Sequence, residues 1–537
     1  MRGFAFLAAL LALAGCGDDR TVTPFPDDGG TDANAMDGAA DGSSDASLDG
    51  SSDGRVDGGM STVAGPAEIV REGAGGYLLR GIVLTPDGPL DPGEVLVEGN
   101  MIACVAADCS ASPGADTVTV IDTRGIISPG LIDSHNHLPY NFLPEWIPDP
   151  MRLFGNRYQW ADVDSYEEHV LPYTARRSTG THFCPAAKWG ELRAIVHGTT
   201  TIQGQSLRQA CINRLARNAD HFHGLGYDHM QTTISSPRDI TDSQAMGYVE
   251  NFTASSQPTT RLAVHMGEGI EGSNIELEFS SFAGRDTRSN RHAGVSLLQA
   301  ADGSYRGVGL LIHTVAIQSP EIMEIADTDS KMVWSPSSNL VLYGATAPIG
   351  EILDMGITVG IGPDWSVSGE DDILAEMRFA LNWAAIEGVA QITPRRLWEM
   401  ATFDGADVVG LAESIGELRP GLRADISVFS RIGPDPYAAV VESRTRDVRL
   451  VFIDGVAYYG DLALEVATAV NGECDMFDAC GEPKFLCVRD TPGDSSRADE
   501  TLDDLELQLF NILEGIGYPP EEQYGRGAEL LPLANCQ

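Results

Sequence analysis

The sequence predicts an α/β barrel with a β-rich segment on either side, and three observations carry this prediction. The middle of the chain alternates apolar strand-like runs with helical segments, as a barrel of parallel strands requires. The two flanking segments hold short strand-like runs separated by turns. Four apolar runs each end near a residue that can bind a metal: His135 and His137 in PGLIDSHNH, His265 in LAVHMGEG, His313 in GLLIHT and Asp364 in TVGIGPDW. A barrel carries its chemistry at the carboxyl ends of its strands, so these side chains form the candidate site.

The amino-terminal residues 1–15 have the pattern of an export signal. One arginine precedes an apolar stretch from Phe4 to Ala14, which is too short to span a bilayer as a mature helix. Small residues lead into Cys16, and this predicts a bacterial lipoprotein signal with lipid on Cys16. An ordinary secretory signal is the alternative. We therefore expect a lipid-anchored protein of the cell envelope, either periplasmic or at the outer membrane or cell surface.

Residues 16–63 are rich in Asp, Gly and Ser and predict a disordered tether. From Asp37 to Asp57 an aspartate recurs at every fourth position, where like charges oppose a helix. Calcium binding by this run is the alternative, but its spacing fits no calcium-loop pattern. The whole chain has 78 acidic and 35 basic residues and a formal net charge of −43. Such a surface repels phosphates, so we expect no nucleic-acid partner.

Nine cysteines fit an exported protein. With Cys16 carrying lipid, eight remain, and an even number in an oxidising compartment predicts disulfides. A cysteine metal site is the alternative, and no CxxC spacing supports it. We expect each cysteine to pair with its nearest neighbour in the sequence, in the order Cys104, Cys109, Cys184, Cys211, Cys474, Cys480, Cys487 and Cys536.

The domain boundaries follow from these patterns. Residues 64–126 and 411–465 are the β-rich flanks, and residues 127–410 hold the alternating strands and helices. Within the latter, AAKWGELRAIVHGTTTIQG illustrates the repeating unit, with a helix that ends at Gly198 and the strand TTTI after it. Residues 466–537 form a cysteine-bearing extension. Its expected helix begins after Thr501 and ends at Gly515, with an apolar face formed by Leu502, Leu505, Leu509 and Ile512. We expect this face to pack on the body, and binding of a partner is the alternative.

A long aromatic insertion, Pro139 to Pro185, separates the first strand from the first helix. A long loop at this face is often a functional lid, and a purely structural loop is the alternative. A second His-x-His pair, His221 and His223, has no partner segments, so we interpret it as a loop or core pair. The remaining histidines occupy no predicted strand end and are interpreted as structural or surface residues: His169, His182, His197, His229 and His292.

The motifs PGLIDSHNH, HGTTTI, HMGE, SPSSNLVLYG, GIGPDW and PGLRADISVF together resemble the amidohydrolase superfamily of metal-dependent hydrolases over roughly residues 65–460. The resemblance is to the branch that holds cytosine deaminases, guanine deaminases and triazine chlorohydrolases. It implies a (β/α)8 TIM barrel with a small β-sandwich, in which residues 64–126 pair with residues 411–465.

The resemblance also implies the roles of the site residues. His135, His137, His265 and Asp364 would bind one divalent metal, with zinc the first choice and iron the second. The metal would lower the pKa of a bound water towards about 7 and so supply hydroxide, and Asp364 would also accept the proton of that water. His313 would orient the water or polarise the substrate, and direct ligation is left open. Glu268, in the HxxE pattern, would shuttle the proton to the leaving group.

Lysine usage predicts a single metal. Binuclear members of the superfamily bridge two metals with a carboxylated lysine on strand four, but residues 206–260 contain no lysine. The sequence has lysine only at positions 188, 331 and 484, and Lys188 precedes strand two on a helix. Near the mouth, Trp365 would narrow the pocket or stack on a flat substrate, or only pack on the barrel. Ser337 and Asn339 in SPSSNL would support the pocket or contact the substrate.

These implications predict an enzyme that hydrolyses a C–N bond of a small cyclic or aromatic amine or amide, as deaminases do. The first alternative keeps the chemistry and changes the bond to a cyclic amide, a lactone or a peptide-like amide at the cell surface. The second alternative is a binding lipoprotein without catalysis. Substrate identity, oligomeric state and the role of the extension are left open by the sequence.

Overall fold

The fold is taken from a computed structural model, which leaves the predicted signal and tether at residues 1–63 outside the described residues. No helix in the described part of the chain is both long enough and apolar enough to cross a bilayer. The structure describes residues 65–148, 150–173, 183–204, 215–221, 225–226, 228–233, 237–286, 294–465, 474–489, 500–516 and 530–536.

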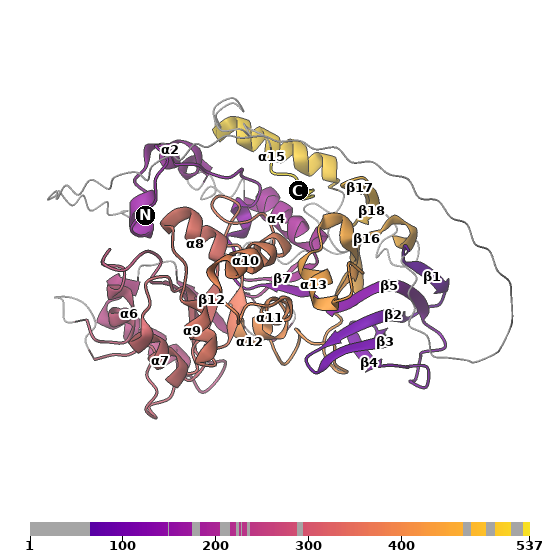
Figure 1. Ribbon diagram of the computed structural model, residues 1–537, viewed down its shortest axis with the longest axis horizontal. Coiled ribbons are helices and arrows are strands. Elements are labelled where there is room, and N and C mark those ends of the chain that lie inside the picture. Colours follow the sequence, from indigo (N-terminus) through magenta and orange to yellow (C-terminus); the bar gives the residue numbers. More distant parts are fainter. Residues whose placement is uncertain are drawn as a thin grey trace, which may run out of the picture. The chain divides into compact units, whose positions relative to one another are not determined.

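Strands from both flanks of the chain pair in one sheet of ten strands. β5 is the junction, because it pairs in parallel with β2 and antiparallel with β14, which lies on the other flank. In Figure 1 the indigo β2–β5 and the orange-to-yellow β16–β18 lie on the same side of the described body. The strands are β1 (Glu68–Arg71), β2 (Gly76–Thr85), β3 (Gly88–Glu98), β4 (Met101–Ala106), β5 (Thr119–Pro129), β14 (Ile426–Ser430), β15 (Val448–Ile453), β16 (Val456–Asp461), β17 (Asp475–Ala479) and β18 (Glu482–Leu486).

The extension contributes a hairpin to this sheet, which its sequence did not lead us to expect. β17 and β18 pair with each other, and β18 continues the ladder of β16. The Cys104–Cys109 disulfide agrees with nearest-neighbour pairing. In the extension that pairing is wrong, since the disulfides are Cys474–Cys487 and Cys480–Cys536. The β17–β18 hairpin brings its two ends together, and with them Cys474 and Cys487. Cys480 lies at the turn of the hairpin and pairs with Cys536 in the carboxyl-terminal segment.

The alternating region forms two parallel sheets, one of three strands and one of five. The sheets meet where Asn136 pairs with Asp364 in a parallel bridge. Within the described residues no ladder joins β8 to β9, so the barrel is not closed there. The strands are β6 (Leu131–Asp133), β7 (Thr199–Ile202), β8 (Arg217–Asn218), β9 (Met230–Thr233), β10 (Arg261–Met266), β11 (Gly309–His313), β12 (Lys331–Trp334) and β13 (Val359–Ile361). Their side chains are almost all buried, as expected for parallel strands covered on both faces.

Helices follow most of these strands and cover them. They are α1 (Arg157–Trp160), α2 (Asp164–His169), α4 (Phe183–Val196), α5 (Asp242–Phe252), α6 (Leu277–Phe282), α7 (Ser319–Asp327), α8 (Pro336–Tyr343), α9 (Ile349–Asp354), α10 (Ile373–Glu387), α11 (Pro394–Met400), α12 (Phe403–Val408), α13 (Pro436–Val441) and α15 (Leu502–Ile516). Short 3-10 helices are η1 (Leu138–Tyr140), η2 (Pro237–Asp239), η3 (Thr445–Asp447) and η4 (Leu462–Leu464).

The helix predicted in the extension is present as α15. Thr501 Oγ1 accepts the Asp504 N–H, and Asp504 Oδ2 accepts the Thr501 N–H, so the two residues cap the helix reciprocally. The apolar face that contains Leu505 and Leu509 is buried. α15 contacts α4, and Figure 1 shows the yellow helix beside the magenta one. The extension therefore packs on the body, as one of the two interpretations of its sequence expects.

Candidate metal centre

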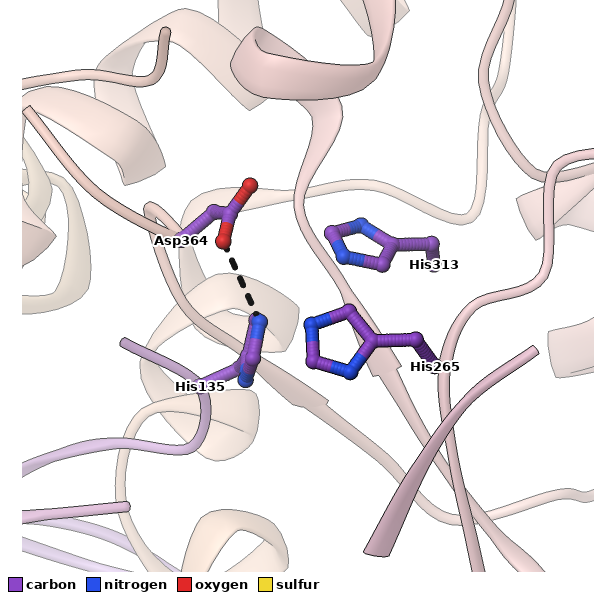
Figure 2. Close-up of side chains that lie close together, drawn as sticks. All are labelled: His135, His265, His313 and Asp364. Carbon is purple, nitrogen blue, oxygen red and sulfur yellow. Dashed lines mark ion pairs between the residues drawn. The ribbon is translucent and has the colours of Figure 1, made fainter. Parts of the chain in front are cut away.

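Four side chains from different strand ends point toward one place (Figure 2). They are His135, His265, His313 and Asp364, and their ligand atoms all lie within 4.8 Å of one another. His265 lies in β10 and His313 ends β11, while His135 and Asp364 follow β6 and β13. The carboxyl ends of these parallel strands thus gather residues that are up to 229 positions apart in the chain, from 135 to 364.

His137 joins this group from the side that is open to solvent. Its Nε2 lies 3.3 Å from Asp364 Oδ1 and 3.4 Å from His265 Nε2, and His135 Nε2 lies 3.2 Å from the same Asp364 oxygen. Ligands of a tetrahedral zinc ion, bound at about 2.0–2.1 Å, lie about 3.3 Å from one another. The spacing of His135, His137, His265 and Asp364 therefore fits one zinc-sized cation, with His313 directly beside them.

The backbone is strained where two of these side chains turn inward. His313 has a φ of 71° and Asp364 a φ of 74°, and both values lie in the left-handed region that residues other than glycine rarely adopt. Each such residue costs on the order of 1–3 kcal/mol and persists only where the surrounding structure holds it. The fold therefore maintains these two turns against their intrinsic preference.

A chain of hydrogen bonds sets the tautomer of His135. The amide nitrogen of Gln203 donates to Asp220 Oδ1 over 2.9 Å, which turns its Oε1 toward His135 Nδ1 at 3.2 Å. An amide oxygen can only accept a hydrogen bond, so Nδ1 carries the hydrogen. The lone pair of His135 is then on Nε2, which faces Asp364 and the other ligand atoms. This is the orientation that a metal-binding histidine needs.

Asn339 does the same for His313. Its amide nitrogen donates to Thr346 Oγ1, and its Oδ1 lies 3.0 Å from His313 Nδ1. Burial lowers the pKa of His313 to about 3, so the ring is neutral at pH 7 with its lone pair on Nε2. Burial also holds the pKa of His265 well below its ordinary value. On the carboxylate side, Ser338 Oγ donates to Asp364 Oδ2 over 2.7 Å and leaves Oδ1 facing the histidines.

The donor set has the chemistry of a cation site. Within the part of the chain that the structure describes, His135 Nε2, His313 Nε2 and Asp364 Oδ1 are buried and have no hydrogen-bond partner. Buried polar atoms without a partner are costly, and several of them facing one point are expected where a cation binds. The three lysines lie elsewhere, in ion pairs of Lys188 with Glu500, Lys331 with Asp329 and Asp407, and Lys484 with Asp461. A lysine bridge between two metals is therefore absent from this centre.

Glu268 lies beside the metal ligands, buried after β10. Its Oε2 is 3.8 Å from His313 Nε2 and 3.6 Å from Arg157 Nη1, and its Oε1 accepts the Tyr343 hydroxyl over 2.6 Å. Burial raises the pKa of Glu268, and the Arg157 guanidinium opposes that rise. A carboxyl group with a raised pKa keeps its proton to a higher pH than an exposed glutamate does, as a general acid requires.

The other residues singled out from the sequence lie around the centre or away from it. Asn339 supports His313, but Ser337 bonds to Glu376 and does not touch the ligands. The Trp365 ring lies 5.3 Å from the His137 ring and is almost fully buried, so it packs on the site wall. His221 lies in a turn after β8, 4.0 Å from Asp228, and its neighbour at position 223 lies outside the described residues.

The histidines that were expected to be structural lie away from the metal ligands wherever the structure describes them. His197 is buried between Arg193 and Thr445, His229 contacts the Val409 carbonyl, and His169 ends α2. The other two, at positions 182 and 292, lie outside the described residues. None of the three described histidines reaches the cluster of ligands.

The insertion packs its aromatic side chains against this wall. Rings of Tyr140 and Trp160 lie 5.3 and 5.8 Å from the Trp365 ring, and Trp146 packs against Phe154 and Tyr166. The insertion also supplies Arg157, whose Nη1 donates to the His265 carbonyl over 3.2 Å. Whether the segment moves as a lid stays a prediction.

Sequence reasoning missed several residues that hold the site in place. Gln203 directly follows β7. The rule that polar residues at the carboxyl ends of strands form the site, which identified the histidines, could therefore have found Gln203 as well. Ser338 lies inside the SPSSNL motif. Tyr343 lies in the longer motif SPSSNLVLYG, but nothing there marks it as a partner of Glu268. Arg157 carries no such signal, because it lies in the insertion.

The chain is similar in sequence and in fold to known proteins. The chain is 26% identical over 420 residues to the 5'-deoxyadenosine deaminase of Methanothermobacter thermautotrophicus. The alignment covers 72% of this chain and 94% of that protein. E. coli guanine deaminase superposes with a TM-score of 0.54 at 16% identity, over 72% of this chain and 99% of its own. A zinc-bound adenosine deaminase from Xanthomonas campestris gives a TM-score of 0.52 at 15% identity, over 72% of this chain and 94% of that one.

At such identities the two superpositions concern the fold. The family is established by a different comparison, in which the profile of the amidohydrolase family matches residues 126–457. This match begins before β6 and ends within β16, so it includes all five residues of the candidate metal centre and Glu268. The chain belongs to the amidohydrolase family.

Proposed function

We propose that this protein is a metal-dependent hydrolase that cleaves a C–N bond of a small cyclic or aromatic amine, with release of ammonia or an amine. The relative quoted above is a 5'-deoxyadenosine deaminase, and both structural neighbours are deaminases. The observation that carries the proposal is the convergence of His135, His265, His313 and Asp364 with Glu268 beside them.

His135, His137, His265 and Asp364 are the residues that would hold the metal, and zinc is the first choice because the adenosine deaminase neighbour binds it. When bound, a divalent metal supplies a nucleophile at neutral pH by lowering the pKa of water towards about 7. Asp364 Oδ1 accepts a proton from the attacking water. His313 Nε2, with its lone pair fixed by Asn339, orients that water toward the substrate.

Glu268 moves the protons that the reaction requires. Water adds to an sp² carbon of the substrate, and Glu268 Oε2 delivers a proton to the ring nitrogen that gains the electron pair. Glu268, now a carboxylate, takes the proton of the hydroxyl group on the tetrahedral carbon and passes it to the departing nitrogen, so the C–N bond breaks as the C=O bond forms and neutral ammonia or amine leaves. The proton that Asp364 accepted from the water then returns to Glu268 and restores the starting state. Such proton transfers typically contribute about 10²–10⁴-fold to the rate.

The test is Glu268→Gln, which keeps the shape of the side chain and the hydrogen bond from Tyr343 but cannot carry the proton. We expect the variant to bind zinc in the same stoichiometry as the wild-type protein and to lose about 10²–10⁴-fold in kcat on an aminopurine, aminopyrimidine and triazine panel. Ammonia release and metal analysis are the measurements. A variant with undiminished kcat removes the proton shuttle from the proposal, and a wild-type protein that binds no divalent metal removes the function.

We also propose the finer features of the fold. The eight parallel strands β6–β13 belong to a (β/α)8 barrel, and the two flanks form a β-sandwich beside it. The agreement in fold with guanine deaminase supports the barrel, and the pairing of β5 with β14 supports a module built from both flanks.

For the location of the protein we propose a lipid anchor on Cys16 in the cell envelope. The apolar stretch before this cysteine and the disulfides of the described chain support an exported protein. Mass spectrometry of the amino-terminal peptide from the native host should find acyl chains on Cys16. Detection of an unmodified peptide cleaved at another site would instead favour the secretory signal.

A further inference from the structure

A half-buried tryptophan, Trp160, and two buried residues, Tyr343 and Glu268, form a directed chain of hydrogen bonds that ends at Glu268. The Trp160 Nε1 hydrogen points to the Tyr343 hydroxyl oxygen over 3.1 Å, and the Tyr343 hydroxyl lies 2.6 Å from Glu268 Oε1. An indole nitrogen can only donate, so the Tyr343 oxygen accepts from Trp160. The single proton of the hydroxyl group is then directed at the carboxylate. Trp160 therefore fixes the direction in which Tyr343 donates.

This hydrogen bond makes the two oxygens of Glu268 different. Oε1 is occupied by the Tyr343 hydroxyl, whereas Oε2 is the oxygen that lies 3.8 Å from His313 Nε2. Without the bond to Oε1 the carboxyl group can rotate about its terminal torsion, which has only a broad preference. With the bond, Oε2 is held on the side of the metal ligands. Arg157 Nη1, at 3.6 Å from Oε2, acts from the same side.

The segment that carries Trp160 is itself bound to the loop that carries Glu268. The Arg157 N–H donates to the Glu268 carbonyl over 3.1 Å, and the Ile270 N–H donates to the Gly155 carbonyl over 2.8 Å. Asn156 Nδ2 adds a bond of 2.8 Å to the Ser273 carbonyl. Three contacts within this short stretch keep Trp160 in register with the loop. The insertion thus builds part of the surroundings of Glu268 and does not only cover them.

We propose that Tyr343 and Trp160 are positioning residues that hold Glu268 Oε2 toward the reacting atoms, an inference that rests on the proposed function of Glu268. Tyr343 acts on the carboxylate directly, and Trp160 acts through Tyr343. The specific consequence is that the two residues are coupled. Loss of the indole N–H matters only while the Tyr343 hydroxyl is present.

The experiment compares Tyr343→Phe, Trp160→Phe and the double variant in the zinc-loaded full-length protein. We expect Tyr343→Phe to lower kcat by about 10- to 100-fold, the range typical of residues that orient a catalytic group, with KM and zinc content within about twofold of the wild type. Trp160→Phe keeps an aromatic ring but removes the indole N–H, and it should lower kcat by less than Tyr343→Phe does. The double variant should match Tyr343→Phe and not multiply the two losses.

Tyr459→Phe is the matched control, because Tyr459 in β16 is also buried and its hydroxyl donates over 3.0 Å to the carbonyl of Thr445 in η3. It measures the effect of losing a buried hydroxyl hydrogen bond away from the site. We expect it to lower Tm as much as Tyr343→Phe and to leave kcat unchanged. If both variants lower kcat in proportion to Tm, the role of Tyr343 is structural and the proposal is overturned.

The proposal and the proposed function fail in different ways. An active Glu268→Gln enzyme refutes the shuttle, whereas an inactive Glu268→Gln with a fully active Tyr343→Phe refutes only the positioning. The positioning proposal is also overturned if the double variant loses kcat by the product of the two single losses. A crystal structure of zinc-loaded Tyr343→Phe gives a readout that needs no turnover. More than one rotamer of the Glu268 carboxylate supports the proposal, and a single rotamer identical to the wild type contradicts it.

Discussion

Replacing Gln203 with leucine tests whether the surroundings of His135 are built for a metal. The variant removes the acceptor at 3.2 Å from His135 Nδ1, and both side chains are almost fully buried, so the ring N–H is left without a partner. An unsatisfied buried donor costs about 1–3 kcal/mol. In the zinc-free variant the ring can carry its hydrogen on Nε2, toward Asp364 Oδ1 at 3.2 Å, so the cost arises only when zinc is bound. At about 1.4 kcal/mol per tenfold, this energy corresponds to a zinc affinity that is weaker by roughly 5- to 150-fold. The range includes the 10–100-fold typical of groups that orient metal-binding histidines.

The assay is competition for zinc with a chromophoric chelator, and Asn339→Leu is the companion variant. Asn339 holds His313 as Gln203 holds His135. If His313 orients water and does not ligate, Asn339→Leu should change the zinc Kd by less than about threefold, because it leaves the ligands untouched, while kcat falls. Equal losses of affinity in both variants would make His313 a ligand. An unchanged Kd for Gln203→Leu would refute the reasoning about His135.

Three further predictions concern stability. Asp425→Asn should destabilise the protein by about 1–3 kcal/mol in urea unfolding, because Arg217 loses a buried partner at 3.0 Å but keeps Asp454 at 3.2 Å; an unchanged free energy of unfolding would contradict this. Burial lowers the pKa of His229 to about 4, below the ordinary 6.5, so the unfolded chain binds its proton first. Stability should be complete above about pH 6.5 and fall toward pH 4, and His229→Gln should flatten this fall; equal pH profiles would exclude the effect. The double variant Cys480→Ala, Cys536→Ala should lose about 2–4 kcal/mol, measured against the oxidised wild type, and an unchanged midpoint would show that the tail contributes little.

The strands that carry the site could be predicted because each is a continuous apolar run with a polar residue at its end. RLAVHM is β10, and GLLIH is β11, as their β-branched and apolar composition indicates. The rule works because parallel strands buried on both faces leave few places for a histidine except their ends. It identified residues that the structure brings together, with His135 Nε2 and Asp364 Oδ1 at 3.2 Å.

The groups that orient these residues could not be predicted in the same way. Tyr343 and Glu268 are 75 positions apart, and nothing in the local sequence of either indicates their contact. The predicted disulfide pairing in the extension was wrong for a related reason. Proximity along the chain suggested that Cys474 would pair with Cys480, but the β17–β18 hairpin places Cys474 opposite Cys487. Long-range folding decided both cases.

The pairing of β5 with both flanks of the chain has a consequence for how the protein is synthesised. One edge of β5 is completed by β14, whose first residue is synthesised roughly three hundred positions after β5 ends. At about 5–20 residues per second, a ribosome needs some fifteen to sixty seconds to cover that distance. During this time β1 can pair with residues 120–122 of β5, but residues 125–129 do not yet have β14 to pair with and are open to other chains. A chaperone that covers residues 125–129 during this interval would keep the nascent chain from pairing with other chains through this edge.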